Sequence, residues 1–297
     1  YKHLDAGTAK PPPELRKRVP HHLVDLVEPT ERFTVHDWLK FAETTLTRVQ
    51  SSGGVPIVVG GTNLYLKALL EGLFDGPGQD PAFRASLDGV PDAELHQRLQ
   101  STDSAAAARI APADRQRLTR ALEVHHLTGQ PISELQKEWA ENPPAAYRHD
   151  PILIGLRWPP EAINPRINLR VKAMFYPNKI DPALAAAVCI NGESLPDEVR
   201  RLVEEQRLRP GEQAAEALGY KQVLAALYPS AFCPGAAAAD RLINDLDDAF
   251  ERTKILTRRF AKQQRTWLKR FHGVRWIDMP GADPLVAALD HLGTPTP

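Results

Sequence analysis

The sequence predicts an α/β fold with an inserted helical unit, and three observations carry this prediction. Short β-branched runs alternate with helical periodicity early in the chain and return near its end. The intervening stretch 75–147 shows helical periodicity and no candidate strand. The chain has 297 residues, which is more than one compact core usually needs, so we expect a main domain with a smaller added unit.

The first predicted elements lie between residues 21 and 73. A strand at 21–27 precedes an amphipathic helix at 35–50. The apolar run 55–59 predicts a second, buried strand, and helical spacing resumes at 63–73. This alternation of strand and helix is typical of an α/β domain.

Two loops in this part of the chain suit a ligand. Gly60 and Gly61 let a ligand approach the backbone, and the free N–H groups at the following helix start favour an anion or a nucleotide edge. Many α/β proteins use such a pair simply to turn the chain, so it does not establish a site alone. The loop from Gly7 to Lys10 adds small residues, one cation and a following proline run, which also suits a phosphate or a base edge.

The inserted helical unit begins at a run of turn-forming residues, 75–81. Within it, Asp114 predicts a helix start and Gly129 the end of that helix. Arg117 and Arg120 lie three residues apart on this helix. Either they grip neighbouring phosphates, or they pair with acidic residues of the same helix, namely Asp114 and Glu123.

Sheet character returns at 151–158, and a last strand is predicted at 274–277. A long helix ends near Phe271, just before that strand. Pro177, Pro182 and Pro196 interrupt the helical pattern between them, so we expect residues 176–196 to form an inserted surface loop.

The composition bounds the class of protein. Hydrophobic content of 42% is ordinary, and no apolar run is long enough to span a membrane, so we expect no membrane partner. The two cysteines lack metal-ligand spacing, and the first residues form no signal sequence, which indicates the cytoplasm. We expect no metal site built from protein side chains, and the sequence contains no GxxxxGK[ST], GxSxG, HExxH or CxxC motif.

The distribution of charge is more informative than its sum, because 37 basic and 37 acidic residues cancel. The stretch 252–270 holds eight Lys or Arg and no acidic residue. On a helix, four of these cations lie on one face and form a cationic stripe. Four apolar residues, Leu256, Phe260, Trp267 and Phe271, lie roughly on the opposite face. The stripe consists of Arg258, Lys262, Arg265 and Lys269. Because no acid is available for pairing along the helix, a polyanionic partner explains the stripe better than a merely solvated face.

Four segments together resemble the bacterial tRNA dimethylallyltransferases of the IPP transferase family. They read YKHLDAGTAKP, VPIVVGGTNLYLKALLEGL, DRQRLTRALEVHHLTG, and ALGYKQV followed by LTRRFAKQQRTWL, at 1–11, 55–73, 114–129 and 217–268. The resemblance implies a P-loop-kinase-like parallel sheet core at 1–74 and 148–297, with a tRNA-binding helical domain at 75–147. It implies transfer of a dimethylallyl group from dimethylallyl diphosphate to N6 of the adenosine next to the anticodon, with Mg²⁺ as cofactor. We expect a cytoplasmic monomer that binds the tRNA anticodon arm.

The resemblance also implies roles for individual residues. Thr8 and Lys10 would line the mouth of the catalytic tunnel, and Arg170 would reach the diphosphate. The other matching positions, together with three cations of the stripe, would contact tRNA: Thr62, Arg84, Gln116, Arg117, Leu118, Thr119, Arg120, Gly219, Tyr220, Lys221, Arg258, Lys262 and Arg265.

The sequence departs from the family at one place. In the family, a Walker-A-like loop and an Asp-Ser motif precede the position that corresponds to Tyr1, and the Asp of that motif is the base. Neither motif occurs in this sequence. We therefore expect the sequence to be incomplete and these 297 residues alone to be inactive. Two alternatives stay open: an adenylate isopentenyltransferase acting on free nucleotide, and a non-catalytic RNA-binding remnant.

Overall fold

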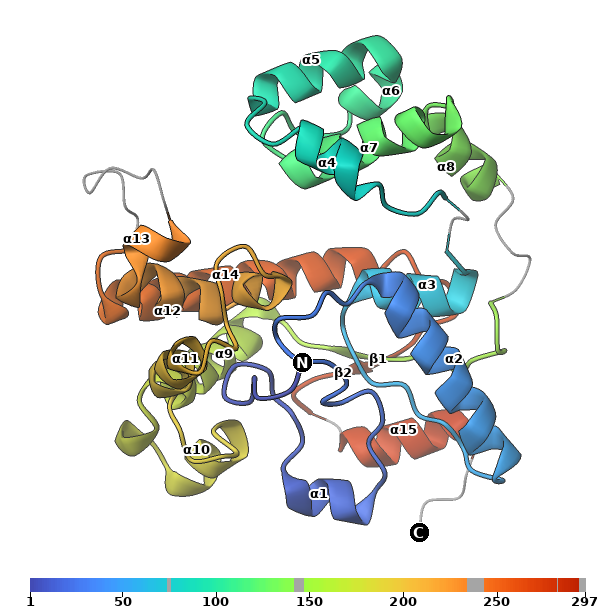
Figure 1. Cartoon of the computed structure of the whole chain (residues 1–297). Coiled ribbons are helices and arrows are strands. Elements are labelled where there is room, and N and C mark those ends of the chain that lie inside the picture. Colours follow the sequence, from blue (N-terminus) through green and yellow to red (C-terminus); the bar gives the residue numbers. More distant parts are fainter. Residues whose placement is uncertain (74–75, 142–146, 234–242, 282, 294–297) are drawn as a thin grey trace. The chain divides into compact units, whose positions relative to one another are not determined.

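The computed structural model describes residues 1–73, 76–141, 147–233, 243–281 and 283–293. The chain divides into two compact units, which we treat separately. The core unit comprises Tyr1–Leu66 and Ile152–Pro297, and the helical unit comprises Lys67–Pro151. Most elements are helices, and the described strands form one two-stranded parallel sheet (Figure 1).

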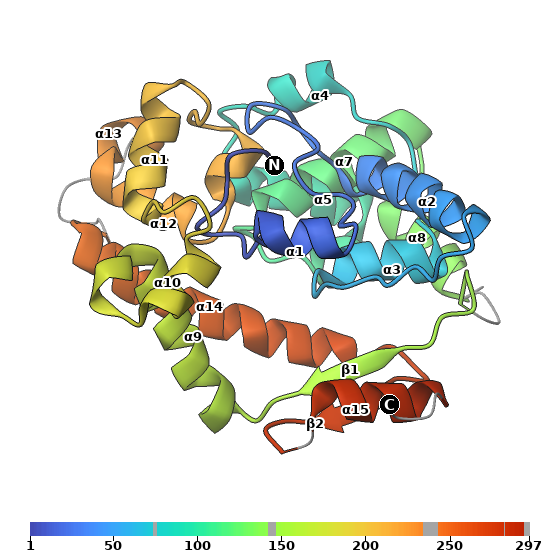
Figure 2. The same ribbon diagram turned by 90° about the horizontal axis from the view of Figure 1, so that it is seen from below.

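The sheet lies in the core unit and pairs β1 (Ile154–Arg157) with β2 (Arg275–Asp278). The register places Ile154 opposite Arg275, and a fork of two hydrogen bonds joins the Arg157 guanidinium to the Asp278 carboxylate. Helix α15 (Pro284–Leu292) packs along this pair (Figure 2). Both strands were predicted from the β-branched and aromatic character of their sequences, and both predictions are confirmed.

The two earlier strand predictions, 21–27 and 55–59, are wrong. Neither segment has a neighbouring strand in the described part of the chain, and both are irregular. Val55, Ile57 and Val59 are 84%, 83% and 90% exposed. An extended run becomes a strand only when another strand supplies partners for its N–H and C=O groups, and sequence alone does not show whether that neighbour is there.

The N-terminal helices of the core unit follow their local signals. Helix α1 (Pro13–Arg18) begins with a proline, and α2 (Val35–Ser51) begins at a capping box between Thr34 and Asp37. Helix α3 (Asn63–Glu71) starts directly after the glycine pair and continues across the boundary between the two units. The helices predicted at 35–50 and 63–73 are thus confirmed to within two residues.

The hydrophobic core of this unit is built mainly by four helices: α9 (Pro160–Phe175), α11 (Leu195–Glu204), α12 (Tyr220–Leu227) and α14 (Leu246–Leu268). Smaller helices surround them: η1 (Pro177–Lys179), α10 (Pro182–Val188), η2 (Gln213–Glu216) and α13 (Pro229–Phe232). Helix α14 packs against both α9 and α12.

The prediction of a surface loop at 176–196 is wrong. Pro177 and Pro182 are the first residues of η1 and α10, and Pro196 is the second residue of α11. A missing N–H leaves no helix bond unmade there, so these prolines start helices instead of breaking one. Val188 and Cys189 are buried in the core, and the Cys189 thiol donates to the Ala173 carbonyl. This segment is part of the folded body.

The helical unit contains only helices among its described residues, as predicted. They are α4 (Pro81–Ser86), α5 (Asp92–Thr102), α6 (Ser104–Ala107), α7 (Arg115–Thr128) and α8 (Ile132–Glu141). The predicted limits of α7 are confirmed: the Asp114 carboxylate accepts from the Arg117 N–H, and Gly129 ends the helix with a φ of 71°. Leu95, Leu99 and Leu118 are fully buried in its core.

No helix among the described residues is long and apolar enough to cross a membrane.

Candidate active site and RNA-binding surface

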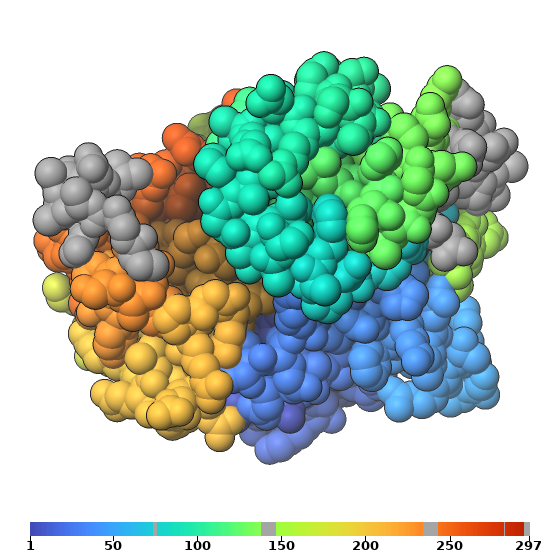
Figure 3. Space-filling model, turned by 45° about the horizontal axis from the view of Figure 1, so that its top comes forward, coloured from blue at the N-terminus to red at the C-terminus, as the bar shows by residue number. Residues whose placement is uncertain are grey.

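The loop that carries Thr8 and Lys10 lies in the core unit beside α10 and α11. In the space-filling view the blue N-terminal segment adjoins the yellow residues of that region (Figure 3). The Thr8 hydroxyl donates to the Leu4 carbonyl at 2.5 Å, and the Thr8 residue is exposed. Ala9 adopts a φ of 56°, a left-handed conformation that turns the loop sharply before Lys10.

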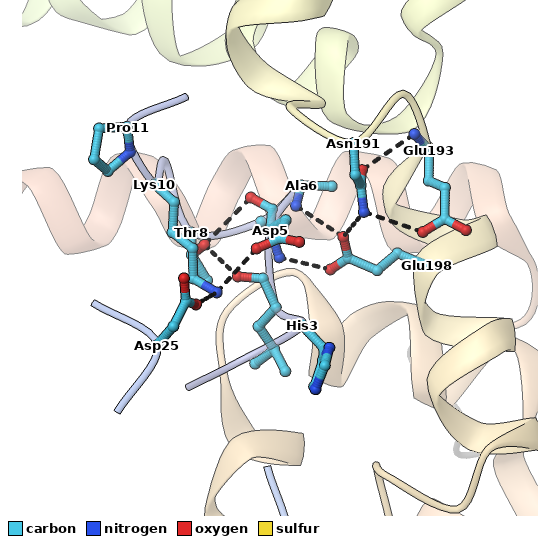
Figure 4. Close-up of polar contacts among 12 residues, drawn as sticks. His3, Asp5, Ala6, Thr8, Lys10, Pro11, Asp25, Asn191, Glu193 and Glu198 are labelled. Atoms are coloured by element: carbon cyan, nitrogen blue, oxygen red, sulfur yellow. Dashed lines mark hydrogen bonds and ion pairs between the residues drawn. The ribbon is translucent and has the colours of Figure 1, made fainter. Parts of the chain in front are cut away.

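Lys10 is buried and bound to two carboxylates (Figure 4). Its Nζ lies 2.9 Å from Asp5 Oδ1 and 2.6 Å from Asp25 Oδ1, and Asp25 also accepts from Arg16 Nη1 at 2.7 Å. Burial raises the pKa of the Asp25 carboxyl, but the hydrogen bonds from Lys10 and Arg16 outweigh it and lower that pKa. As placed, Lys10 belongs to an ion network, a role that the isolated loop sequence did not predict.

Arg170 lies on α9 and is only partly accessible to solvent. Burial lowers the pKa of its guanidinium, and no charged neighbour contributes to that shift. In the described part of the chain its side chain has no hydrogen bond and no acidic partner. A half-buried guanidinium without an anion is costly, so this position favours an anionic ligand.

The glycine junction contacts helix α14. The Gln264 amide donates to the Gly61 carbonyl at 3.0 Å, and a Cβ at Gly61 would come within 2.3 Å of the Gln264 side chain. Asn63 Oδ1 is buried there without a hydrogen-bond partner among the described residues. Thr62 is exposed beside it. A side chain at Gly61 would displace the Gln264 amide, and neither Asn63 nor Gln264 was singled out from the sequence.

The cationic stripe lies on α14 as predicted. Lys262, Arg265 and Lys269 line an open pocket of about 580 Å³ together with Trp158 and Pro159. None of the four stripe cations has an acidic partner in the described ranges of the chain, and Arg258 makes only a long 3.4 Å hydrogen bond to Asn168 Oδ1.

The predicted apolar face of this helix is only partly correct. Phe260 is 45% exposed, because it lies in the half of α14 that extends past the buried core residues Ala249 and Thr253. Leu256, Trp267 and Phe271 are half-buried.

Two arginines of the helical unit bind a buried carboxylate. Glu123 is fully buried on α7, and it accepts from Arg84 at 2.7 Å through two nitrogens and from Arg120 at 2.7 Å. Arg120 also donates to the carbonyls of Pro77 and Gly78. Burial raises the pKa of Glu123, but these hydrogen bonds outweigh it and lower the pKa to about 2. Of the two readings of Arg120, the structure has the acidic pairing.

The remaining expected tRNA contacts divide by accessibility. Gln116 and Arg117 are exposed, and Arg117 Nε lies 3.4 Å from the Asp114 carboxylate. Thr119 is half-buried. The side chains of Leu118 and Tyr220 are fully buried in their cores, so neither offers a surface to RNA.

The GYK segment of the core unit sits at the start of α12. Gly219 has a φ of 95°, which favours glycine, and Lys221 forms an ion pair with Glu216. The sequence alone could not show which of these motif residues face inward.

Comparisons of the whole chain with known proteins identify its family. The family model described as IPP transferase matches residues 1–271. A tRNA dimethylallyltransferase of Geobacter sulfurreducens is 38% identical over 286 residues, which cover 94% of this chain and 81% of that protein. A tRNA dimethylallyltransferase of Mycobacterium leprae is 37% identical over 296 residues, covering 98% of this chain and 85% of that protein.

Solved structures give the same result. A full-length tRNA isopentenylpyrophosphate transferase of Bacillus halodurans matches with a TM-score of 0.61 and 28% identity, over 99% of this chain and 83% of that chain. A tRNA isopentenylpyrophosphate transferase of Staphylococcus epidermidis matches with a TM-score of 0.59 and 27% identity, over 99% and 86%. A eukaryotic dimethylallyltransferase acting on tRNA shares the fold at a TM-score of 0.67 and 21% identity, over 98% and 70%. The chain belongs to the IPP transferase family.

Proposed function

We propose that the protein transfers a dimethylallyl group from dimethylallyl diphosphate to N6 of the adenosine next to the anticodon in tRNA. Membership of the IPP transferase family and the names of its relatives support this reaction. We also propose that the core unit is the P-loop-kinase-like part of the fold and that the helical unit carries the tRNA-binding surface. The observation that carries the proposal is the half-buried Arg170, which has no acidic partner among the residues that the structure describes.

The chemistry explains why such an arginine is needed. An allylic diphosphate ionises when its developing negative charge is stabilised and water is kept away. Arg170 supplies a half-buried cation with no acidic partner among the described residues, whereas Lys10 is already bound to Asp5 and Asp25. Arg170 is therefore suited to bind the diphosphate leaving group, and the Lys10 ion network is suited to hold the loop that carries Thr8.

We propose Mg²⁺ as the cofactor, as the family resemblance implies. Among the described residues no group of three or more His, Cys, Asp or Glu side chains is placed to hold a metal ion. Mg²⁺ commonly retains its waters and binds substrate phosphates with one or two carboxylates.

The RNA side of the reaction rests on the cationic stripe. Phosphate contacts fix the register of a nucleic acid, and the target base must leave its stack to react. Lys262 and Arg265 have no acidic partner among the described residues, and the same pocket is lined by Trp158, whose ring has the Arg166 guanidinium 4.7 Å from its centroid. In the helical unit we propose Gln116 and Arg117 as the accessible contacts, since Arg84 and Arg120 already bind Glu123.

Transfer of radiolabelled dimethylallyl groups tests this function in a protein that carries the family's Walker-A-like loop and Asp-Ser motif ahead of Tyr1. Arg170→Gln should lower kcat/KM for the diphosphate by about 100- to 1,000-fold, since one fixed stabiliser of the leaving group is lost. Lys172→Gln, on the same helix but exposed, is the matched control and should change nothing. Unchanged kinetics of the Arg170 variant would contradict the assignment, and transfer to AMP in preference to tRNA would instead support an adenylate isopentenyltransferase.

A further inference from the structure

A fully buried carboxylate outside the proposed reacting groups holds the loop of Thr8 and Lys10. Glu198 on α11 has no accessible surface, yet four donors bind it. Figure 4 shows its hydrogen bonds with Asp5, Ala6 and Asn191. The backbone N–H of Asp5 donates to Oε1 at 3.0 Å, and that of Ala6 donates to Oε2 at 3.0 Å. The Tyr220 hydroxyl donates to Oε1 at 2.6 Å and the Asn191 amide donates to Oε2 at 3.3 Å.

We call Glu198 and Tyr220, with the hydrogen bonds by which they hold residues 5–7, the clamp. Tyr220 adds a third residue of the loop to those that Glu198 binds. Its hydroxyl accepts from the Gly7 N–H at 3.2 Å while donating to Glu198. A Cβ at Gly7 would lie 2.4 Å from the Tyr220 ring, so only glycine lets the loop backbone reach that hydroxyl. Three successive N–H groups, those of Asp5, Ala6 and Gly7, are therefore bound by two side chains from α11 and α12.

The held backbone in turn places the two side chains that the sequence singled out. Asp5, fixed by its N–H, offers its carboxylate to Lys10 at 2.9 Å and its carbonyl to the Thr8 hydroxyl at 3.2 Å. The path from Glu198 to Thr8 and Lys10 is thus a continuous set of hydrogen bonds within the core unit (Figure 4).

A purely stabilising role does not need this arrangement. Burial raises the pKa of Glu198 despite its hydrogen bonds, so a carboxylate is an expensive way to fill this part of the core. Apolar side chains of similar volume fill such space at least as well, but they cannot orient three backbone N–H groups. The geometry suits orientation of the loop.

We propose that Glu198 and Tyr220 are positioning residues, which fix the backbone of residues 5–7 and through it the side chains of Thr8 and Lys10 for prenyl transfer. The proposal rests on the proposed function for its kinetic part. Neither side chain is placed to touch a substrate, because both are fully buried.

Two substitutions and one control test it in the whole protein. Tyr220→Phe removes the bridging hydroxyl and keeps the ring against Gly7, and Glu198→Gln replaces one acceptor oxygen by an amide donor. Glu204→Gln is the control, because Glu204 is exposed on the same helix and has no hydrogen bond or ion pair with Glu198, Tyr220 or residues 5–7.

Amide hydrogen exchange in peptides covering residues 1–10, corrected for intrinsic rates, measures how well the clamp protects these N–H groups, independently of activity. Loss of one hydrogen bond should speed exchange in Tyr220→Phe about five- to tenfold, and more in Glu198→Gln. The control should match the unsubstituted protein. Unchanged exchange in Tyr220→Phe would overturn the clamp.

Kinetics then separates positioning from structural support. We expect kcat to fall about 10- to 100-fold in Tyr220→Phe, with KM for tRNA within about twofold, because a misplaced loop affects the reacting geometry and leaves the RNA surface intact. In the double variant kcat should fall no further than in the worse single variant. A lowered Tm with unchanged kcat would overturn the positioning role.

The control on function is the unsubstituted protein carrying the family's Walker-A-like loop and Asp-Ser motif ahead of Tyr1. If it transfers no dimethylallyl group to tRNA, the proposed function fails, while exchange at residues 5–7 still decides whether the clamp exists. Should Glu198→Gln not fold, Tyr220→Phe carries the test alone, since it removes one oxygen atom and no packing volume.

Discussion

At the scale of single residues, Glu123 shows how one buried carboxylate changes the roles of the arginines around it. Arg84 and Arg120 match positions that the family resemblance assigns to tRNA, yet both guanidinium groups are bound to this carboxylate. The Asp80 N–H also donates to it, so the start of α4 depends on the same group. We infer that these arginines first stabilise the helical unit.

Removing the carboxylate should therefore destabilise the helical unit. We expect Glu123→Gln to lower its free energy of unfolding by about 3 kcal/mol at pH 7, because two guanidinium groups are left without their anion. Urea unfolding, followed by amide exchange in α5 and α7, measures this. Glu94→Gln, which breaks an exposed pair with Arg98, is the control and should cost less than about 1 kcal/mol.

The same carboxylate gives the helical unit a defined pH dependence. Its folded pKa of about 2 lies below its ordinary value of 4.5, so its contribution to stability is present above pH 4.5 and is lost as the pH falls toward 2. Glu123→Gln should abolish that part of the pH dependence. An unchanged pH profile in the variant would contradict the assignment.

At the scale of elements, α14 combines packing and binding along its length. Its first half is buried against α9 and α12, and its second half presents Lys262, Arg265 and Lys269 to an open pocket. These cations have no acidic partner in the parts of the chain that the structure describes, so removing them breaks no ion pair. Binding and stability should therefore respond differently to their loss.

Neutralising two stripe cations should weaken RNA binding without unfolding the protein. In Lys262→Gln with Arg265→Gln, the slope of log affinity against log salt should flatten by about 1.4 to 1.8, and all tRNAs should be affected alike, since phosphates carry no sequence. Titrations at three salt concentrations measure this. Lys254→Gln, which breaks a pair with Glu251 on the same helix, should leave the slope unchanged. A lower Tm with an unaltered slope would mean that the stripe is structural.

The segment 176–196 was predicted to form a surface loop, but in the structure it is part of the core. Deleting it and joining Phe175 to Asp197 through a short glycine linker should prevent folding, since Val188, Cys189 and Leu195 would leave the core. Circular dichroism and size-exclusion chromatography of the variant check this. A folded, cooperative deletion variant would contradict the burial described above.

At the scale of the whole molecule, the two units differ in how well their sequences predicted them. The helical unit is made of local elements with clear start and stop signals, such as Asp114 and Gly129, and these need no distant partner. The core unit joins segments that are far apart in sequence, as in the pairing of β1 with β2 and of Asp5 with Glu198. Its local signals were accordingly less reliable.

The sequence by itself determined helices α2, α3, α7 and α14, the two strands that pair, the cationic stripe and the family, because periodicity, caps and motif order are local properties. It did not determine that 21–27 and 55–59 lack strand partners, nor that Lys10, Arg84 and Arg120 are bound to acids. Those facts depend on which distant groups meet. Only the tertiary structure brings Glu198 to Asp5 across 193 positions of the chain, and the partial burial of Arg170 likewise depends on packing.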